Sequence, residues 1–493
     1  MAAARLALGL LWAAALEGVL TNSLSRCDAP PCSCDDYGRL TCDCRDEGEE
    51  LVLTSEGERK LSPHTSRIVV GNCSVVVLSN SSLTSMTGLR SVDLVNVANL
   101  SLARQSFQLS PRSSRTRITI RNSSMDQLPS YAFHGNVERI SFEGVRIGLV
   151  SAFAFADLVG TETLTLENCY VETMEAQAFK KFDVDFFHVI GGSFGEVVPS
   201  RAFNDIEVEK KFMLDGVEMG TVRSSAFIIK KPKTVAIQNC VFGSVESEAF
   251  GITASGTVVI KNNTFRNLAV GAFLGIRGDP ESKAQSDSPS DTLSDLIFKD
   301  NTLGSFEEGS VMFDRSSFKP ELDNVFVDQP CDCEQLPVWR NNILNYSNVY
   351  SRLYGGGALL QEPINDEPET FLCVDAGDQD TPVSFADFEP RHCAIAGSVL
   401  FFVLLLAGLL VVLVAAAVLG VWCWRRRREN SRKRWISVPT NAPDVVSKKN
   451  GVIGREPAPV DSRITMVVPD GRLYRETEFH VIVEKAEPLT TEL

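Results

Sequence analysis

The chain has 493 residues, of which 44% are hydrophobic and 23% are charged. Its formal net charge is −15, which gives no basic footprint for nucleic acid and argues against a nucleic-acid-binding protein. A chain of this length exceeds the usual size of one hydrophobic core, unless its fold grows by repetition.

The N-terminal residues 1–21 are predicted to be a signal peptide. Arg5 supplies a short positive region, and the apolar stretch from Leu6 to Leu16 is too short to span a membrane stably. Cleavage is expected between Ala15 and Ser23. The chain is therefore expected to enter the secretory pathway, where conditions are oxidising.

A cysteine-rich segment follows. Residues 27–44 read CDAPPCSCDDYGRLTCDC, and five cysteines in 18 residues of an extracellular protein imply disulfides. The candidate disulfide cysteines here are Cys27, Cys32, Cys34 and Cys42. Cys44 is the odd cysteine of this group, and Cys73 is a candidate partner for it.

An internal repeat fills the middle of the chain. An Ala-Phe pair recurs at spacings of 22 to 24 residues, with its phenylalanine at positions Phe133, Phe155, Phe179, Phe203, Phe227, Phe250 and Phe273. A short strand with two alternating apolar residues precedes most pairs, as in Ile118/Ile120, Ile140/Phe142, Leu164/Leu166, Phe187/Val189, Phe212/Leu214, Val235/Ile237 and Val258/Ile260, with further copies starting at Ile68, Val92 and Leu296. Alternation places both apolar side chains on one face, which a single repeat cannot bury alone, so the repeats must stack.

The repeats resemble leucine-rich repeats of the pattern LxLxxNxL…AFxxL over residues 61–328. The best matches are Val258-x-Ile260-x-x-Asn263-x-Phe265 and the copy that starts at Leu296 and has Asn301 at the asparagine position. The resemblance implies a repeat solenoid, with a leucine-rich-repeat-like parallel β ectodomain between two cysteine caps at 27–60 and 329–393. In the C-terminal cap it implies that Cys331 and Cys333 pair with Cys373 and Cys393.

The pattern also departs from this family. The buried asparagine that satisfies backbone groups after the strand is replaced by Val145, Gly192 and Val217 in three consecutive repeats. A parallel β-helix is therefore the rival architecture. Cysteines occupy the asparagine position at Cys169 and Cys240, three repeats and roughly 14 Å apart at strand spacing, so both are expected to be buried free thiols.

Residues 277–292 interrupt the array with a polar segment rich in Ser, Asp and Pro, which predicts a flexible loop. The segment starts with Arg277-Gly278-Asp279, the tripeptide that integrins recognise. Integrin binding and a chance occurrence are both open interpretations of it.

Residues 394–424 carry no charge and are long enough to cross a bilayer as one helix. Four arginines follow directly at 425–428, which marks the cytoplasmic end. Six glycosylation sequons precede this helix and none follows it; they begin at Asn72, Asn80, Asn99, Asn122, Asn262 and Asn345. The predicted topology is a single-pass type I protein of the plasma membrane with an extracellular N-terminus. Cys393 abuts the helix and is expected either to belong to the cap or to link two chains.

The tail, 425–493, is expected to be mostly disordered and is too short for a kinase. Its last residues include Thr491 and Leu493, which fit a terminus that PDZ domains capture by strand addition. A chance match is the alternative. Cys423 is a candidate for palmitoylation or an inert membrane cysteine.

The residue between the two apolar strand positions points away from the core. Along the array this position is mostly polar and then becomes apolar in the last four copies, at Met213, Ala236, Val259 and Ile297. We expect these four to form an exposed stripe that binds a protein ligand or a second copy of the chain. The alternative is that the 277–292 loop or a glycan on Asn262 covers it.

The histidines His64, His134, His188, His392 and His480 lack metal-ligand spacing, and neither a nucleophile set nor a phosphate loop is evident. We expect no enzyme, metal or cofactor. The leading hypothesis is a cell-surface recognition or adhesion receptor that binds an extracellular protein and, through its tail, an adaptor. The alternative is a structural protein that organises membrane or matrix without signalling.

Overall fold

The structure is a computed structural model that describes residues 26–45, 50–57, 59–109, 115–281, 293–344, 371–377 and 381–433. The predicted signal peptide, the Asn345 sequon and the terminal residues Thr491 and Leu493 lie outside the described residues.

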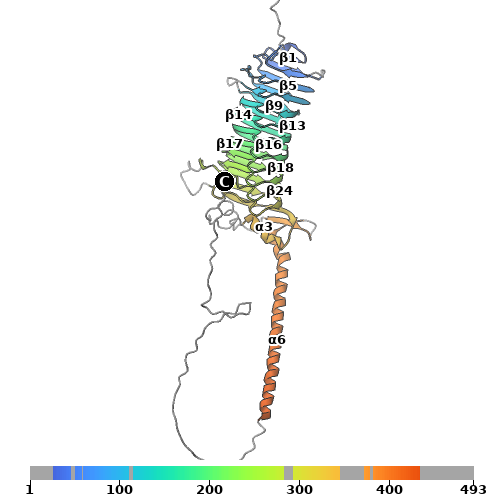
Figure 1. Cartoon of the computed structure of the whole chain (residues 1–493), viewed down its shortest axis with the longest axis vertical. Helices are drawn as coiled ribbons and strands as arrows, with labels where there is room; N and C mark the ends of the chain where they lie inside the picture. Colours follow the sequence, from blue (N-terminus) through green and yellow to red (C-terminus); the bar gives the residue numbers. More distant parts are fainter. Residues whose placement is uncertain are drawn as a thin grey trace, which may run out of the picture. The chain divides into compact units, whose positions relative to one another are not determined.

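The fold is a parallel β-solenoid of about 11 turns, with strands stacked in one column (Figure 1). Most complete turns contribute a strand to each of three parallel ladders. The first ladder holds the ten predicted strands, and β2 and β28, which were not predicted, extend it at its two ends. Its members are β2 (Arg39–Asp43), β4 (Arg67–Gly71), β6 (Ser91–Val95), β9 (Arg117–Arg121), β12 (Arg139–Glu143), β15 (Thr161–Met174), β16 (Phe179–Val198), β17 (Phe203–Asp215), β20 (Thr234–Gln238), β23 (Thr257–Lys261), β26 (Ser294–Lys299) and β28 (Phe318–Asp323).

The second and third ladders complete each turn. The second contains β3 (Leu51–Leu53), β5 (Val75–Leu78) and β7 (Asn99–Leu102) as one sheet, then β10 (Ser124–Leu128), β13 (Arg146–Val150), parts of β15 and β16, β18 (Glu218–Val222), β21 (Val241–Val245), β24 (Thr264–Leu268), β27 (Thr302–Phe306), β29 (Val325–Pro330) and β30 (Phe371–Asp375). The third contains β8 (Phe107–Gln108), β11 (Phe133–Asn136), β14 (Phe155–Val159), parts of β16 and β17, β19 (Phe227–Lys230), β22 (Phe250–Ala254) and β25 (Arg277–Gly278).

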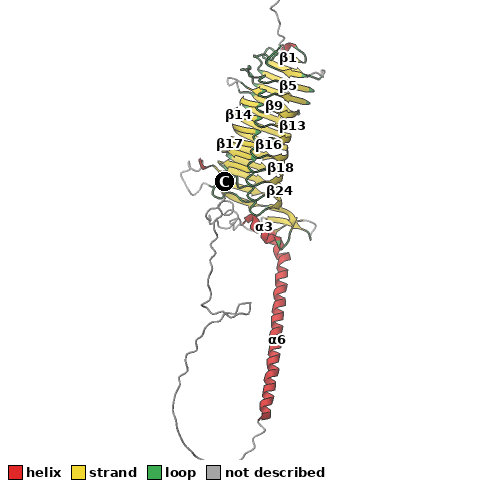
Figure 2. Cartoon of the chain, in the orientation of Figure 1, coloured by secondary structure: helices red, strands yellow, loops and turns green. Residues whose placement is uncertain are grey.

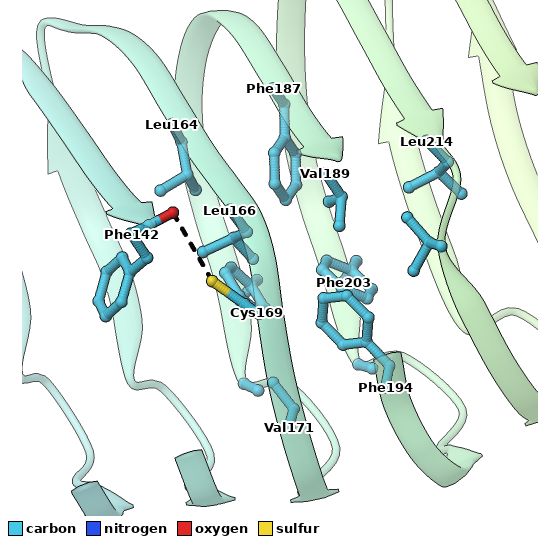
Figure 3. Packing of buried hydrophobic residues seen from close by; sticks show 14 of the residues in the cluster. Phe142, Leu164, Leu166, Cys169, Val171, Phe187, Val189, Phe194, Phe203 and Leu214 are labelled. Carbon is cyan, nitrogen blue, oxygen red and sulfur yellow. Dashed lines mark hydrogen bonds between the residues drawn. The ribbon is translucent and has the colours of Figure 1, made fainter. Parts of the chain in front are cut away.

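The parallel solenoid predicted from the repeats is confirmed, and its three-ladder cross-section includes two strands per turn that the sequence pattern did not predict. The predicted strand pairs and all seven Ala-Phe phenylalanines are buried. Figure 3 shows how side chains from successive turns, such as Phe187 and Phe203, fill the space between the ladders. The core is therefore one continuous column of apolar side chains.

The Ala-Phe phenylalanines, preceded by Phe107, which follows a serine, form a stack that runs along the third ladder. Ring centroids lie 4.7 Å apart for Phe107–Phe133, 4.9 Å for Phe133–Phe155, 4.5 Å for Phe155–Phe179, 4.7 Å for Phe179–Phe203 and 4.6 Å for Phe203–Phe227. The stack continues through Phe250 to Phe273 at wider spacing. The 22- to 24-residue period of the sequence is thus the contour length of one turn.

Disulfides close both ends of the column. In the N-terminal region η1 (Arg26–Asp28) and β1 (Cys32–Cys34) precede β2, and the bonds are Cys27–Cys34, Cys32–Cys42 and Cys44–Cys73. Cys44 is thus bonded to the partner proposed for it, within the first turns of the array.

The C-terminal cap contains α3 (Gln335–Leu344), β30, β31 (Thr381–Ser384), α5 (Phe385–Phe388) and the π-helical segment η3 (Glu389–Cys393). Its bonds are Cys331–Cys373 and Cys333–Cys393. The structure therefore assigns Cys393 to the cap and not to a bond between two chains.

The chain leaves the cap as one long helix, α6 (Ala394–Lys433), drawn in red in Figure 2. Within it, Phe401–Glu429 is long and apolar enough to cross a membrane. This helix and the disulfides fit a single-pass membrane protein.

The Arg-Gly-Asp tripeptide is not presented on a free loop. Arg277 and Gly278 form strand β25, which pairs with β22, and the Asp279 side chain is buried. The Asp279 backbone N–H donates to the carbonyl of Ala254 at 2.7 Å. The tripeptide is thus held in a paired strand with its carboxylate largely buried, which disfavours integrin binding.

Candidate recognition surface

The outward residues at the centre of the first ladder form a row along the solenoid. Pairing of successive strands aligns His188 with Met213, Met213 with Ala236, Ala236 with Val259, and Val259 with Ile297. Adjacent strands lie about 4.8 Å apart, so these residues are direct neighbours from rung to rung. The predicted register of the apolar stripe is present in the structure.

The exposure of the row is smaller than expected. Met213, Val259 and Ile297 are half-buried, and Ala236 is buried with 6% of its surface exposed. The expectation that all four side chains are exposed is therefore wrong for Ala236. Its methyl group is shorter than the side chains of Met213 and Val259 on the neighbouring rungs, which accounts for its smaller exposure.

Polar and charged side chains border the row on both sides. On β17, Lys211 and Asp215 flank Met213, and Asp215 accepts a hydrogen bond from the Gln238 side chain at 2.8 Å. On β23, Thr257 and Lys261 flank Val259. The arrangement is an apolar strip with a polar rim.

His188 precedes Met213 in the same row and ends the apolar part on its N-terminal side. Its Nε2 atom is buried and has no hydrogen-bond partner among the described residues. Burial, and then the positive charge of Lys211, lower the pKa of His188 below its ordinary value. The ring is thus neutral at physiological pH, and it lies 5.7 Å from the ring of Phe186.

An amide ladder, which the sequence did not predict, runs along the corner after the first ladder. Asn72, Asn96, Asn122, Asn239 and Asn262 all have a positive φ between 46° and 57°. Each donates its side-chain N–H to a side-chain oxygen of the preceding turn. Asn96 donates to Asn72 at 3.1 Å and Asn262 to Asn239 at 2.7 Å, whereas Asn239 donates to Asp215, the last residue of β17, at 2.6 Å. The recurrence of Asn at a fixed offset after several of the strands was the available signal for it, although glycine takes this position at Gly144, Gly191 and Gly216 and interrupts the ladder.

This corner ladder includes three of the predicted glycosylation sites. Asn72, Asn122 and Asn262 belong to it, whereas Asn80 and Asn99 are exposed at other positions. Asn262 lines an open groove of about 590 Å³ together with Asn239 and Phe326, and neither Val259 nor Ile297 lines this groove.

The remaining predicted residues lie away from the row. Cys169 and Cys240 are buried free cysteines, and burial raises the pKa of each thiol to about 11. Figure 3 shows the Cys169 thiol directed at the carbonyl of Phe142, 3.6 Å away. Cys423 is exposed on α6.

Neither the comparison with models of protein families nor the search of curated proteins found a match to this chain.

Proposed function

We propose that this protein is a cell-surface recognition receptor that binds an extracellular protein along the first ladder. The observation that carries the proposal is the in-register row of Met213, Ala236, Val259 and Ile297. An apolar strip on an outward β face is expensive to leave in water, and such strips mark partner surfaces. Its length of four rungs, about 14 Å, suits the apolar centre of a protein interface.

We also propose that the repeats of this chain are related to leucine-rich repeats. This part of the proposal is supported by two buried asparagines, Asn263 and Asn301. The Asn263 side chain donates to the Ile237 carbonyl at 2.9 Å and accepts from the Cys240 backbone N–H at 2.9 Å. The Asn301 side chain donates to the Ile260 carbonyl one turn later, also at 2.9 Å. Buried asparagines that satisfy turn backbones in this way are what the leucine-rich-repeat pattern requires.

The membrane topology is the second part of the proposal. The disulfide-bonded solenoid would lie outside the cell, and the tail with its Thr491 and Leu493 terminus would recruit an adaptor inside. An antibody against the tail should then stain only permeabilised cells, and glycosidase treatment should lower the mass of the ectodomain. Staining of intact cells by that antibody would refute the topology.

The recognition surface is tested by charge insertion into the row. Full-length protein carrying Val259→Asp and Ile297→Asp should lose the extracellular neighbours that proximity labelling detects on intact cells. The matched control carries Thr119→Asp and Ser141→Asp, which lie on the same outward column several turns earlier. Equal labelling by the two double variants would refute the assignment of the row.

A structural role without signalling is the competing function. Deletion of the tail after Lys433 separates the two, because only a receptor that signals through an adaptor needs those residues. Sedimentation of the purified protein distinguishes a second copy from another protein as the partner. If the wild type is a dimer and the variant with Val259→Asp and Ile297→Asp is a monomer, then the partner is a second copy of this chain and not a separate ligand.

A further inference from the structure

A row of arginines lies at the start of the first ladder in the N-terminal turns. Arg39 and Arg67 are paired residues of β2 and β4. Arg90 is on the next rung, where its backbone N–H donates to the carbonyl of Ser66 at 2.8 Å. All three side chains are exposed. At strand spacing, their rungs span about 10 Å along the solenoid.

These arginines differ from those that follow them at the same edge of the ladder. Arg117 and Arg139 each have a carboxylate partner, since Arg117 lies 3.8 Å from Glu138 and Arg139 lies 3.1 Å from Glu162. Within the described part of the chain, no carboxylate lies within 4.0 Å of the guanidinium groups of Arg39, Arg67 or Arg90. Three like charges on consecutive rungs repel one another, and an anion placed between them would relieve that repulsion.

The three arginines share a groove of about 450 Å³ with Asp35, Tyr37 and Ser66. Asp35 is the one acidic residue in this lining, and its Oδ1 already accepts from the backbone N–H groups of Tyr37 at 3.0 Å and Arg39 at 2.8 Å. Tyr37 is 88% exposed, so its hydroxyl group is open to a ligand. The groove therefore has an excess of positive charge in a chain whose net charge is −15.

We propose that this groove binds a sulfated polysaccharide. Arginine guanidinium groups match sulfate oxygens in charge and in their forked donor geometry. An open groove with charges repeated from rung to rung suits an extended polymer with regularly spaced sulfates more than one small anion. The groove also lies in the first turns of the solenoid, whereas the cap that leads into α6 follows the last turns, which disfavours a lipid headgroup as the ligand. The site is separate from the apolar row and independent of the function proposed for it.

The test uses full-length protein in detergent and immobilised heparin as the probe, at physiological salt. The variant Arg67→Gln with Arg90→Gln should bind heparin at least about tenfold more weakly, because it loses two charge-assisted contacts. The control, Arg117→Gln with Arg139→Gln, changes the net charge by the same amount at the same edge and should bind nearly as the wild type does. Thermal unfolding of both variants verifies that each is folded.

Three further arms define the ligand. Chemically desulfated heparin should not bind, and free inorganic phosphate at matched ionic strength should not compete. Phosphatidylserine vesicles should bind no better to wild type than to the Arg67→Gln and Arg90→Gln variant. Equal loss of heparin binding in the two double variants, absence of heparin binding by wild type, or vesicle binding that depends on Arg67 and Arg90 would each overturn the proposal.

Discussion

Replacement of Phe203 by alanine tests whether the phenylalanine stack holds the solenoid together. Phe203 is completely buried, and its ring centroid lies 4.7 Å from that of Phe179 and 4.6 Å from that of Phe227. Phe203 therefore joins three consecutive turns, and alanine at this position removes the link on both sides.

The expected loss follows from the burial and the stacking. Truncation of a buried phenylalanine to alanine costs about 3 to 5 kcal/mol, and each well-placed aromatic pair contributes about 0.5 to 1.5 kcal/mol beyond burial. Because Phe203 has a stacked neighbour on each side, Phe203→Ala should lower the free energy of unfolding by an amount at the upper end of this range, about 4 to 5 kcal/mol. Phe203→Leu retains most of the volume but not the stacking and should cost about 1.5 kcal/mol.

Hydrogen exchange by mass spectrometry on the full-length protein in detergent measures how much stability the variant loses and which turns lose it. Each turn of a solenoid contacts only its neighbours, so amide protection should fall in β16, β17 and β19 and persist in distant turns. Phe186→Ala is the control, because this partly buried ring lies on β16 in the same region but outside the phenylalanine stack, and its loss should cost clearly less, about 1 to 2 kcal/mol. A Phe203→Ala variant as stable as Phe186→Ala would refute the role of the stack.

Two further predictions concern the interior. A Cβ on Gly192 would lie 1.9 Å from the carbonyl oxygen of Cys169, and φ is +78°, so Gly192→Ala should lower the free energy of unfolding by about 3 kcal/mol or more, measured by thermal unfolding. Gly57→Ala is its control, with φ +88° and open space around the new carbon, and should cost only about 1 to 2 kcal/mol. The thiols of Cys169 and Cys240 have a pKa of about 11 in the folded protein, compared with 9.0 for an ordinary thiol. Between these values the unfolded chain loses the protons and the folded chain keeps them. The contribution of the neutral buried thiols to stability is therefore present below pH 9.0 and is lost as the pH rises to about 11. Between pH 8 and pH 10.5, the free energy of unfolding should fall less in the Cys169→Ala and Cys240→Ala variant than in wild type. The difference should be on the order of 3 kcal/mol per thiol at most. An equal fall in the two proteins would contradict the raised pKa of the two thiols.

The first ladder could be predicted because its strands alternate strictly. In β9, for example, Ile118 and Ile120 are buried and the residues between and beside them point outward. The second ladder breaks this rule. In β10 the buried residues are Met125 and Leu128, with two outward residues between them, so neither a period of two nor a helical period is visible in five residues.

The alignment of the residues in the candidate surface could be predicted from the sequence, but the exposed fraction of each side chain could not. Strand pairing fixed which side chains are neighbours, because the repeat length brings Val259 beside Ile297 despite the long interruption between them. Exposure depends on the relative lengths of neighbouring side chains, and this is why Ala236 is buried between Met213 and Val259. The arginine row was equally present in the sequence, but the lack of ion-pair partners for its guanidinium groups among the described residues is a property of the folded corner.

The geometry of the corner ladder can by itself account for some of the glycosylation sequons. At Asn122 and Asn262 the asparagine takes a left-handed conformation, the next residue is buried, and the third residue is the first residue of a second-ladder strand. Asparagine suits a positive φ, and Ser or Thr suits a strand, so this corner produces the Asn-x-Ser/Thr pattern whether or not a glycan is attached. Asn80 and Asn99 have no place in that ladder and are exposed. Of the sequons in the described part of the chain, these two therefore favour an extracellular solenoid most, and the disulfides, which need oxidising conditions, favour it independently.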